Sequence, residues 1–217
     1  MKKVHDISPA FDPDCVRCPR IATHLKAVRK EYPQYHASPV APFGNSKPLL
    51  LIVGLGPGMH GANATGRPFT GDHAGILLYQ MLYEFGFGNR AESVGLNDGL
   101  VLKKCRITNA VKCLPPANKP LPSEIHNCNG YLRSELATLT GRLVILALGR
   151  IAHEAVLRAL DLKLKDYGFG HHAIYKLSEQ RTLLDSYHCS RYNTQTKRLT
   201  EPMFRKVFAT ASGLINA

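Results

Sequence analysis

The sequence predicts an α/β fold in which helices cover both faces of a parallel sheet. Short segments bounded by Gly or Pro predict strands, and segments with apolar residues at helical spacing follow them in alternation. Parallel strands need a crossover connection, and the alternation supplies one after each strand. The predicted strands are residues 49–53, 105–111, 143–148 and 182–186.

The first strand leads into a long glycine-rich loop. Residues 49–53 are all apolar and end at Gly54, which is typical of a short strand buried on both faces. Residues 54–72 form the loop. Apolar residues then recur at helical spacing over residues 73–85, where we expect a helix.

Two further strand–helix pairs follow along the chain. A Pro-rich loop joins the strand at 105–111 to Ser123, which we expect to be the N-cap of a helix with one apolar face. The strand at 143–148 precedes a helix over residues 151–160, on which we expect His153 to be exposed.

The last strand leads to a polar loop and a final helix. The strand at 182–186 precedes a loop at 187–197, and Thr200 is expected to cap the helix that closes the chain. Ligands of such sheets bind beyond the carboxyl ends of the strands. The three loops that follow strands, at 54–72, 109–122 and 187–197, should therefore converge on one cleft.

The chain is strongly basic for its length. Its 217 residues fit one α/β domain spanning residues 1–217. Lys and Arg number 28 against 16 Asp and Glu, and the resulting net charge of +12 favours a nucleic acid as partner. No apolar run approaches the ~18–20 residues of a membrane span, and no apolar leader is evident. We therefore expect a cytoplasmic protein.

Four cysteines have the spacing of metal ligands. Cys15 and Cys18 lie on one tight turn, and Cys113 and Cys128 lie on either side of the Pro-rich loop, which could bring their sulfurs to the same centre. Four thiolates suit either zinc or an iron–sulfur cluster. Such a four-cysteine metal centre would tie the N-terminal segment, about residues 1–45, to the rest of the chain. The alternative is that the first two cysteines are unconnected surface thiols.

The glycine-rich loop contains a weak nucleotide-binding pattern and two candidate functional residues. Gly56, Gly58 and Gly61 match G-x-G-x-x-G, but a proline interrupts the match and no helix follows at once, which disfavours a dinucleotide site. Phe69 either packs in the core or offers a ring on which a base can stack. Asp72 either caps the following helix or holds a catalytic water.

Three groups of residues resemble the signature motifs of a known enzyme family. They are GLGPG at 54–58 with GRPFTGD at 66–72, TNAVKC at 108–113 with NKP at 118–120, and YHCSRYNT at 187–194 with RLT at 198–200. Together with the four cysteines, they resemble family 5 uracil-DNA glycosylases, the UDGb type. The resemblance extends from Cys15 to about Phe208.

The resemblance implies a three-layer αβα sandwich with a central four-stranded parallel sheet. It implies a [4Fe–4S] cluster and removal of uracil, with hypoxanthine and xanthine as further substrates. The partner would be double-stranded DNA that contains deaminated bases, and single-stranded DNA is a second possible partner. The protein would be a monomer and would not bind a membrane. Leu55 occupies the position at which family 4 enzymes carry an acidic residue. The cluster ligands would be Cys15, Cys18, Cys113 and Cys128.

The resemblance also implies roles for the loop residues in base flipping and cleavage. His188 would donate a hydrogen bond to the departing base, although from the residues alone it could equally contact phosphate or solvent. Asn109 would bind the base edge, and Asp72 would stabilise the sugar cation or steer water. The expected catalytic residues are Asp72, His188 and Asn109, and the expected base-binding residues are Gly54, Leu55, Gly56, Gly58, Phe69, Asn109 and His188.

A second set of residues would hold the DNA. Ser190 would bind phosphate, and Arg191 or Tyr192 would fill the gap left by the flipped base. Asn193 and Arg198 complete the set. The main alternative is a zinc protein with four cysteine ligands that binds nucleic acid without catalysis; a nucleotide-binding oxidoreductase is a more remote one.

Overall fold

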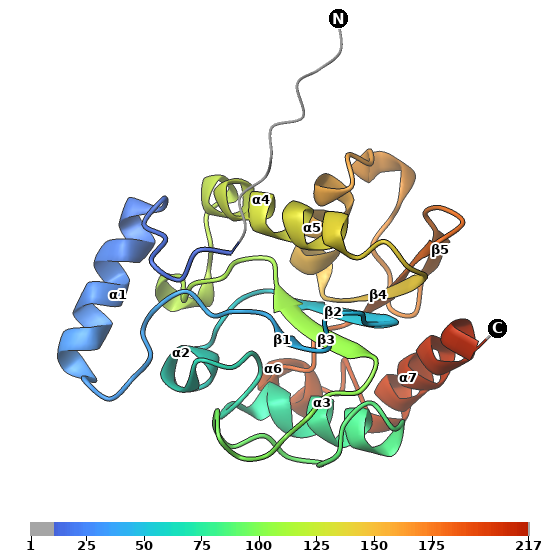
Figure 1. Cartoon of the computed structure of the whole chain (residues 1–217), viewed down its shortest axis with the longest axis horizontal. Coiled ribbons are helices and arrows are strands. Elements are labelled where there is room, and N and C mark those ends of the chain that lie inside the picture. Colours follow the sequence, from blue (N-terminus) through green and yellow to red (C-terminus); the bar gives the residue numbers. More distant parts are fainter. Residues whose placement is uncertain (1–10, 217) are drawn as a thin grey trace, which may run out of the picture.

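A six-stranded sheet crosses the molecule, with helices packed on both of its faces (Figure 1). The computed structural model describes residues 11–216. The strand order is β1-β3-β2-β4-β6-β5. The strands are β1 Phe43–Gly44, β2 Leu50–Gly54, β3 Cys105–Asn109, β4 Leu143–Leu148, β5 Ile174–Lys176 and β6 Arg181–Ser186.

The four central strands are parallel and confirm the predicted sheet. Strands β3, β2, β4 and β6 are neighbours in that order, with Leu50 of β2 opposite Cys105 on one side and Val144 on the other. All residues of β2 and β4 are buried, as their unbroken apolar runs predict. Two short antiparallel strands, β1 and β5, extend the sheet at its edges. These were not predicted, because two or three residues carry no periodic signal.

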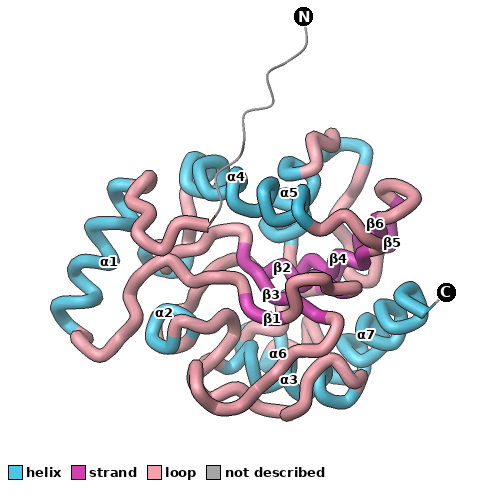
Figure 2. The backbone as a smooth tube through the Cα atoms, viewed as in Figure 1, coloured by secondary structure: helices cyan, strands magenta, loops and turns pink. Residues whose placement is uncertain are grey.

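Seven α-helices surround the sheet in the described part of the chain (Figure 2). Successive residues of β2 point to opposite faces, and the two faces bury different helices. Leu50 packs in a core with residues of α3 and α7, whereas Leu51 packs in a second core with residues of α4 and α5. The helices are α1 Pro19–Glu31, α2 Ala62–Thr65, α3 His73–Glu84, α4 Pro122–Thr138, α5 Arg150–Ala159, α6 Arg191–Gln195 and α7 Glu201–Asn216.

Several local predictions were wrong. Helix α4 begins at Pro122 rather than after Ser123, because Pro suits the first helical position and Glu124 accepts a hydrogen bond from the backbone N–H of Leu121 at 2.7 Å. His153 was expected to be exposed, but only 2% of its surface is accessible because it pairs with the buried Asp185. Helix α1 was missed altogether.

The loops predicted after β2 and β6 each contain a short helix, α2 and α6. The final helix is capped as expected, with the Thr200 hydroxyl accepting from the N–H of Met203 at 3.4 Å. Within residues 11–216, no helix is both long and apolar enough to cross a membrane.

Candidate active site

Two adjacent strands end at the residues that begin the site. Gly54 ends β2 and Asn109 ends β3, and the two residues are partners in the parallel register. A Cβ atom at Gly54 would lie 2.5 Å from Oδ1 of Asn109 and 2.7 Å from Cζ of Phe69. Glycine is therefore required here, because it lets a carboxamide and an aromatic ring contact the end of the strand.

The Asn109 carboxamide is buried but incompletely bonded. The residue is 2% exposed, and its Oδ1 atom has no hydrogen-bond partner among the described residues. A buried polar atom without a partner costs about 1–3 kcal/mol, so native structures seldom keep one without a reason. The position of this atom beyond the carboxyl end of β3 points to a ligand as its partner.

Phe69 is held in a strained conformation against His188. Its φ is +56°, a region in which a non-glycine residue is uncommon. A Cβ atom at Gly75 would lie 1.8 Å from the carbonyl oxygen of Phe69, so the helix can approach this residue only through a glycine. The Tyr79 hydroxyl donates to the Pro68 carbonyl at 2.7 Å and fixes the preceding residue.

His188 projects from the loop that follows β6 and stays neutral. Its ring lies nearly parallel to that of Phe69, with centroids 5.8 Å apart and an interplanar angle of 25°. Burial lowers the pKa of His188 to about 4, so the imidazole carries one N–H donor at neutral pH. The side-chain amide of Asn193 donates to the His188 carbonyl at 2.8 Å.

Asp72 caps α3, which is the first of the two roles that the sequence left open. Oδ1 accepts from the N–H of Gly75 at 3.0 Å and caps α3. Oδ2 lies against the glycine turn, since a Cβ atom at Gly61 would be 2.6 Å from it and one at Gly58 would be 3.4 Å away. Burial raises the pKa of Asp72 above its ordinary value. One carboxylate oxygen is therefore structural, and the other faces the loop.

Sequence reasoning assigned no role to Arg67, which anchors the Phe69 loop. Its guanidinium donates to Asp98 at 2.8 Å and to the carbonyl of Leu96 at 2.7 Å, and it lies 4.4 Å from the ring centroid of Phe43. The side chain is buried, so it does not reach solvent or DNA. Its position between Gly66 and Pro68 was the only signal in the sequence.

The remaining base-binding candidates form the start of the glycine-rich loop. The carbonyl of Gly54 accepts from the N–H of Ala110, and that of Leu55 accepts from Val111, both at 2.9 Å. A Cβ atom at Gly56 would lie 3.3 Å from the Val111 carbonyl. The loop therefore continues the pairing of β2 with β3 for two residues beyond the sheet.

The expected DNA-binding residues lie on and around α6. Ser190 caps this helix by accepting from the N–H of Asn193 at 3.4 Å, so its hydroxyl already has a structural partner. Arg191 is exposed, and Tyr192 is 70% exposed. The guanidinium of Arg198 lies 4.7 Å from the centroid of the Tyr187 ring. The exposed side chains of Arg191 and Tyr192 are therefore accessible to a partner.

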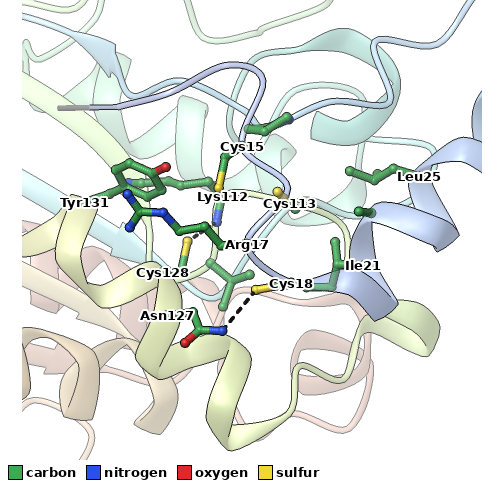
Figure 3. A pocket seen from close by; sticks show the side chains of 13 residues that line it. Cys15, Arg17, Cys18, Ile21, Leu25, Lys112, Cys113, Asn127, Cys128 and Tyr131 are labelled. Atoms are coloured by element: carbon green, nitrogen blue, oxygen red, sulfur yellow. Dashed lines mark hydrogen bonds between the residues drawn. The ribbon is translucent and has the colours of Figure 1, made fainter. Parts of the chain in front are cut away.

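The four cysteines expected to bind a metal line one pocket between α1 and α4 (Figure 3). Two of the sulfurs accept hydrogen bonds, Cys128 from the N–H of Lys112 at 3.2 Å and Cys18 from the side-chain amide of Asn127 at 3.8 Å. Burial and the neighbouring thiols raise the pKa of Cys113.

Among residues 11–216, no three His, Cys, Asp or Glu side chains come close enough to hold a single metal ion. The four cysteines therefore line the pocket without forming a site for a single metal ion. Cys105 is buried in the core, and Cys189 is buried with its thiol 3.4 Å from the Ala74 carbonyl. Of the expected N-terminal segment of about 1–45, residues 1–10 lie outside the described residues.

Comparison with known proteins assigns this arrangement to a family. Residues 41–212 match the family model of the Uracil DNA glycosylase superfamily. The chain belongs to this superfamily. It is 44% identical to the type-5 uracil-DNA glycosylase of Thermus thermophilus over 92% of this chain and 93% of that protein. It is 37% identical to the type-5 enzyme of Pyrobaculum aerophilum over 92% and 88%.

A type-4 uracil-DNA glycosylase from Archaeoglobus fulgidus is 36% identical over 55% of this chain and 53% of that protein. The type-5 relatives thus match a larger share of the chain. This confirms the resemblance to family 5 on which the expectations for the site depend.

Proposed function

We propose that this protein removes uracil from DNA by hydrolysing the N-glycosidic bond, which leaves an abasic site. The main support is structural. Beyond the carboxyl ends of the parallel strands, Asn109 and Phe69 both lie against Gly54, and the ring of Phe69 lies against that of His188. The relatives named above are uracil-DNA glycosylases. Asp72 caps α3 with one carboxylate oxygen, and its other oxygen lies beside the glycine turn, where we propose that it serves the reaction.

The substrate base would enter this site after it is flipped out of the DNA stack. Flipping costs a few kcal/mol, and it costs least for a mispaired base such as a deaminated one. The ring of Phe69 offers a stacking surface. The carboxamide of Asn109, whose Oδ1 has no partner among the described residues, offers a carbonyl and an NH2 group to the base edge. Uracil, hypoxanthine and xanthine share an O=C–N–H edge that pairs with such an amide, so we propose all three as substrates.

Cleavage builds negative charge on the base and positive charge on the sugar. The neutral imidazole of His188 would donate its N–H to the base oxygen on which the negative charge forms. Asp72 would stabilise the sugar cation through the oxygen that faces the glycine turn, and would orient the attacking water. The backbone of Gly54 to Gly58 would enclose the base.

DNA would be bound by the positive charge of the protein and by exposed residues of α6. The net charge of +12 attracts phosphates, and the exposed Tyr192 or Arg191 would fill the space that the flipped base leaves. We propose double-stranded DNA as the main partner, with single-stranded DNA also bound, and a monomer as the acting form. We place the protein in the cytoplasm, at the nucleoid when bound to DNA.

We propose that the pocket between α1 and α4 holds a [4Fe–4S] cluster. The donor set fits, because four cysteines line the pocket and apolar residues such as Ile21 and Leu25 form its wall. When bound, the cluster would act as a structural cross-link between the N-terminal segment and the β3–α4 connection. This chain's own contribution is to supply hydrogen bonds to two of the sulfurs.

The proposal is tested by incubating the purified protein with labelled duplexes that each contain one uracil, hypoxanthine or xanthine. Heating in alkali then breaks the strand wherever the base has been removed. We expect cleavage of the three damaged duplexes and none of an undamaged one. A protein that binds all four duplexes equally and cleaves none would instead be a nucleic-acid-binding protein without catalysis.

A further inference from the structure

The residue before His188 is held by a second histidine from a separate loop. His171 lies between β5 and the short 3-10 helix Leu164–Asp166, and its ring stacks on Tyr187 with centroids 5.0 Å apart and an interplanar angle of 20°. The backbone N–H of Tyr187 donates to Nδ1 of His171 at 3.2 Å. Both contacts act on Tyr187, the residue that precedes His188.

This hydrogen bond needs an unprotonated Nδ1. The ring must then carry its proton on Nε2, so His171 accepts from the backbone only as a neutral imidazole. Burial and the neighbouring His172 lower the pKa of His171, which favours this form. The guanidinium of Arg198 lies 4.7 Å from the centroid of the same Tyr187 ring, so this ring contacts both side chains.

The segment that carries His171 is itself fixed to three elements. Nε2 of His172 bonds to the Thr210 hydroxyl of α7 at 2.8 Å, and the backbone N–H of His172 donates to the Asp185 carbonyl of β6 at 2.8 Å. Nε2 of His153, on α5, lies 3.0 Å from the Tyr167 carbonyl. His171 is therefore presented by a segment that the helices and the sheet hold on several sides.

His153 is paired with Asp185 at 2.9 Å, and both are buried. Phe169 adds an aromatic link, with ring centroids 5.7 Å from His153 and 6.2 Å from Tyr187. A chain of ring contacts thus runs from the core of α5 to the start of the His188 loop. The proposed chemistry requires none of these side chains, so the ring contacts that end at Tyr187 need another explanation.

We propose that His171 is a positioning residue that fixes the Tyr187 peptide and so directs the His188 imidazole toward the base beside Phe69. The inference rests on the role of His188 in the proposed function. A displacement of about 1 Å in a catalytic group can cost roughly a hundredfold in rate, so a hydrogen bond to the residue before His188 can control that rate.

Two variants separate the hydrogen bond from the packing. His171→Phe keeps an aromatic ring on Tyr187 but removes the acceptor, whereas His171→Asn keeps an acceptor near the position of Nδ1 but removes the ring. We expect His171→Phe to lower the single-turnover rate of uracil excision by about tenfold or more, with little change in DNA affinity. We expect His171→Asn to retain most of the rate.

Amide hydrogen exchange at Tyr187 supplies a readout that does not depend on activity. Exchange should be faster in His171→Phe than in the unsubstituted protein, and it should stay slow in His171→Asn. Unchanged rate and exchange in His171→Phe, or equal loss of rate in both variants, would overturn the inference while the proposed function stands. Absence of excision by the unsubstituted protein would overturn the proposed function, and the inference with it.

Discussion

Phe69 and His188 meet across the end of a strand that lies between their own. Phe69 follows β2 and His188 follows β6, and β4 separates these strands in the sheet. Their rings nevertheless lie 5.8 Å apart, nearly parallel. Gly149 follows β4 with φ at +96°, and a Cβ atom there would lie 3.6 Å from Cβ of His188. The two loops close over a strand end that carries no side chain.

Replacement of Gly54 tests how closely the base site is built around the end of β2. Gly54→Ala would place a Cβ atom 2.5 Å from Oδ1 of Asn109 and 2.7 Å from the Phe69 ring. We expect loss of excision by at least about tenfold, together with destabilisation of about 1–3 kcal/mol from overpacking. Gly141→Ala is the control, because a Cβ atom added there would meet no other atom within 4 Å. Equal activity of the two variants would place the base elsewhere.

Substitution of Asp72 separates helix capping from chemistry. Asn caps helices about as well as Asp, so Asp72→Asn should leave the free energy of unfolding nearly unchanged, whereas Asp72→Ala should lower it by about 1 kcal/mol. Both variants lose the carboxylate, and we expect both to lose excision rate. Urea unfolding and single-turnover cleavage check these outcomes. Full activity of Asp72→Asn would show that Asp72 caps the helix but has no role in catalysis.

The pH dependence of the rate follows from the same group. Burial raises the pKa of Asp72 above its usual 3.8, so the carboxylate is protonated at a higher pH than a free aspartate. The rate should fall as pH falls through that raised pKa, and Asp72→Asn should lack this fall.

The free energy of unfolding in acid should depend on His188, because burial lowers the pKa of this residue in the folded protein. Its folded-state pKa is about 4, below the usual 6.5, so between these values the unfolded chain takes up a proton that the folded chain refuses. His188 therefore destabilises the fold as pH drops from about 6.5 toward 4, and has no such effect above about 6.5. Denaturation of His188→Ala should show a shallower loss of stability across this range. An identical slope would show that the imidazole is not buried in the neutral form.

Much of this account could be predicted from the sequence, and the misses have physical causes. The four central strands are continuous apolar runs, and the residues at their ends follow from the geometry of parallel sheets. His153 could not be placed correctly, because its helix position alone does not reveal its partner, Asp185 of β6. Arg67 and His171 were missed for the same reason, since their partners lie far away in the sequence.

The cysteine pocket gives a test of the cofactor that is independent of DNA. A [4Fe–4S] cluster absorbs visible light and colours the protein, whereas zinc does not. Cys15→Ala should abolish this absorbance and the bound iron and sulfide, and should lower the melting temperature. Cys189→Ala is the control, because this buried thiol does not line the pocket. A colourless protein that contains one zinc per chain would contradict the proposed cluster.

If base excision depends on the neutral imidazole of His188, removal of this side chain should slow excision, whereas removal of another histidine should not. Single-turnover excision from a uracil-containing duplex would be compared between the unsubstituted protein, His188→Ala and His126→Ala, which removes an exposed histidine of α4. We expect His188→Ala to lose about 10²–10³-fold in rate, the effect of removing one donor to a developing negative charge, while binding the duplex normally. His126→Ala should cleave at the unsubstituted rate. Cleavage by His188→Ala at that same rate would show that excision does not depend on this imidazole.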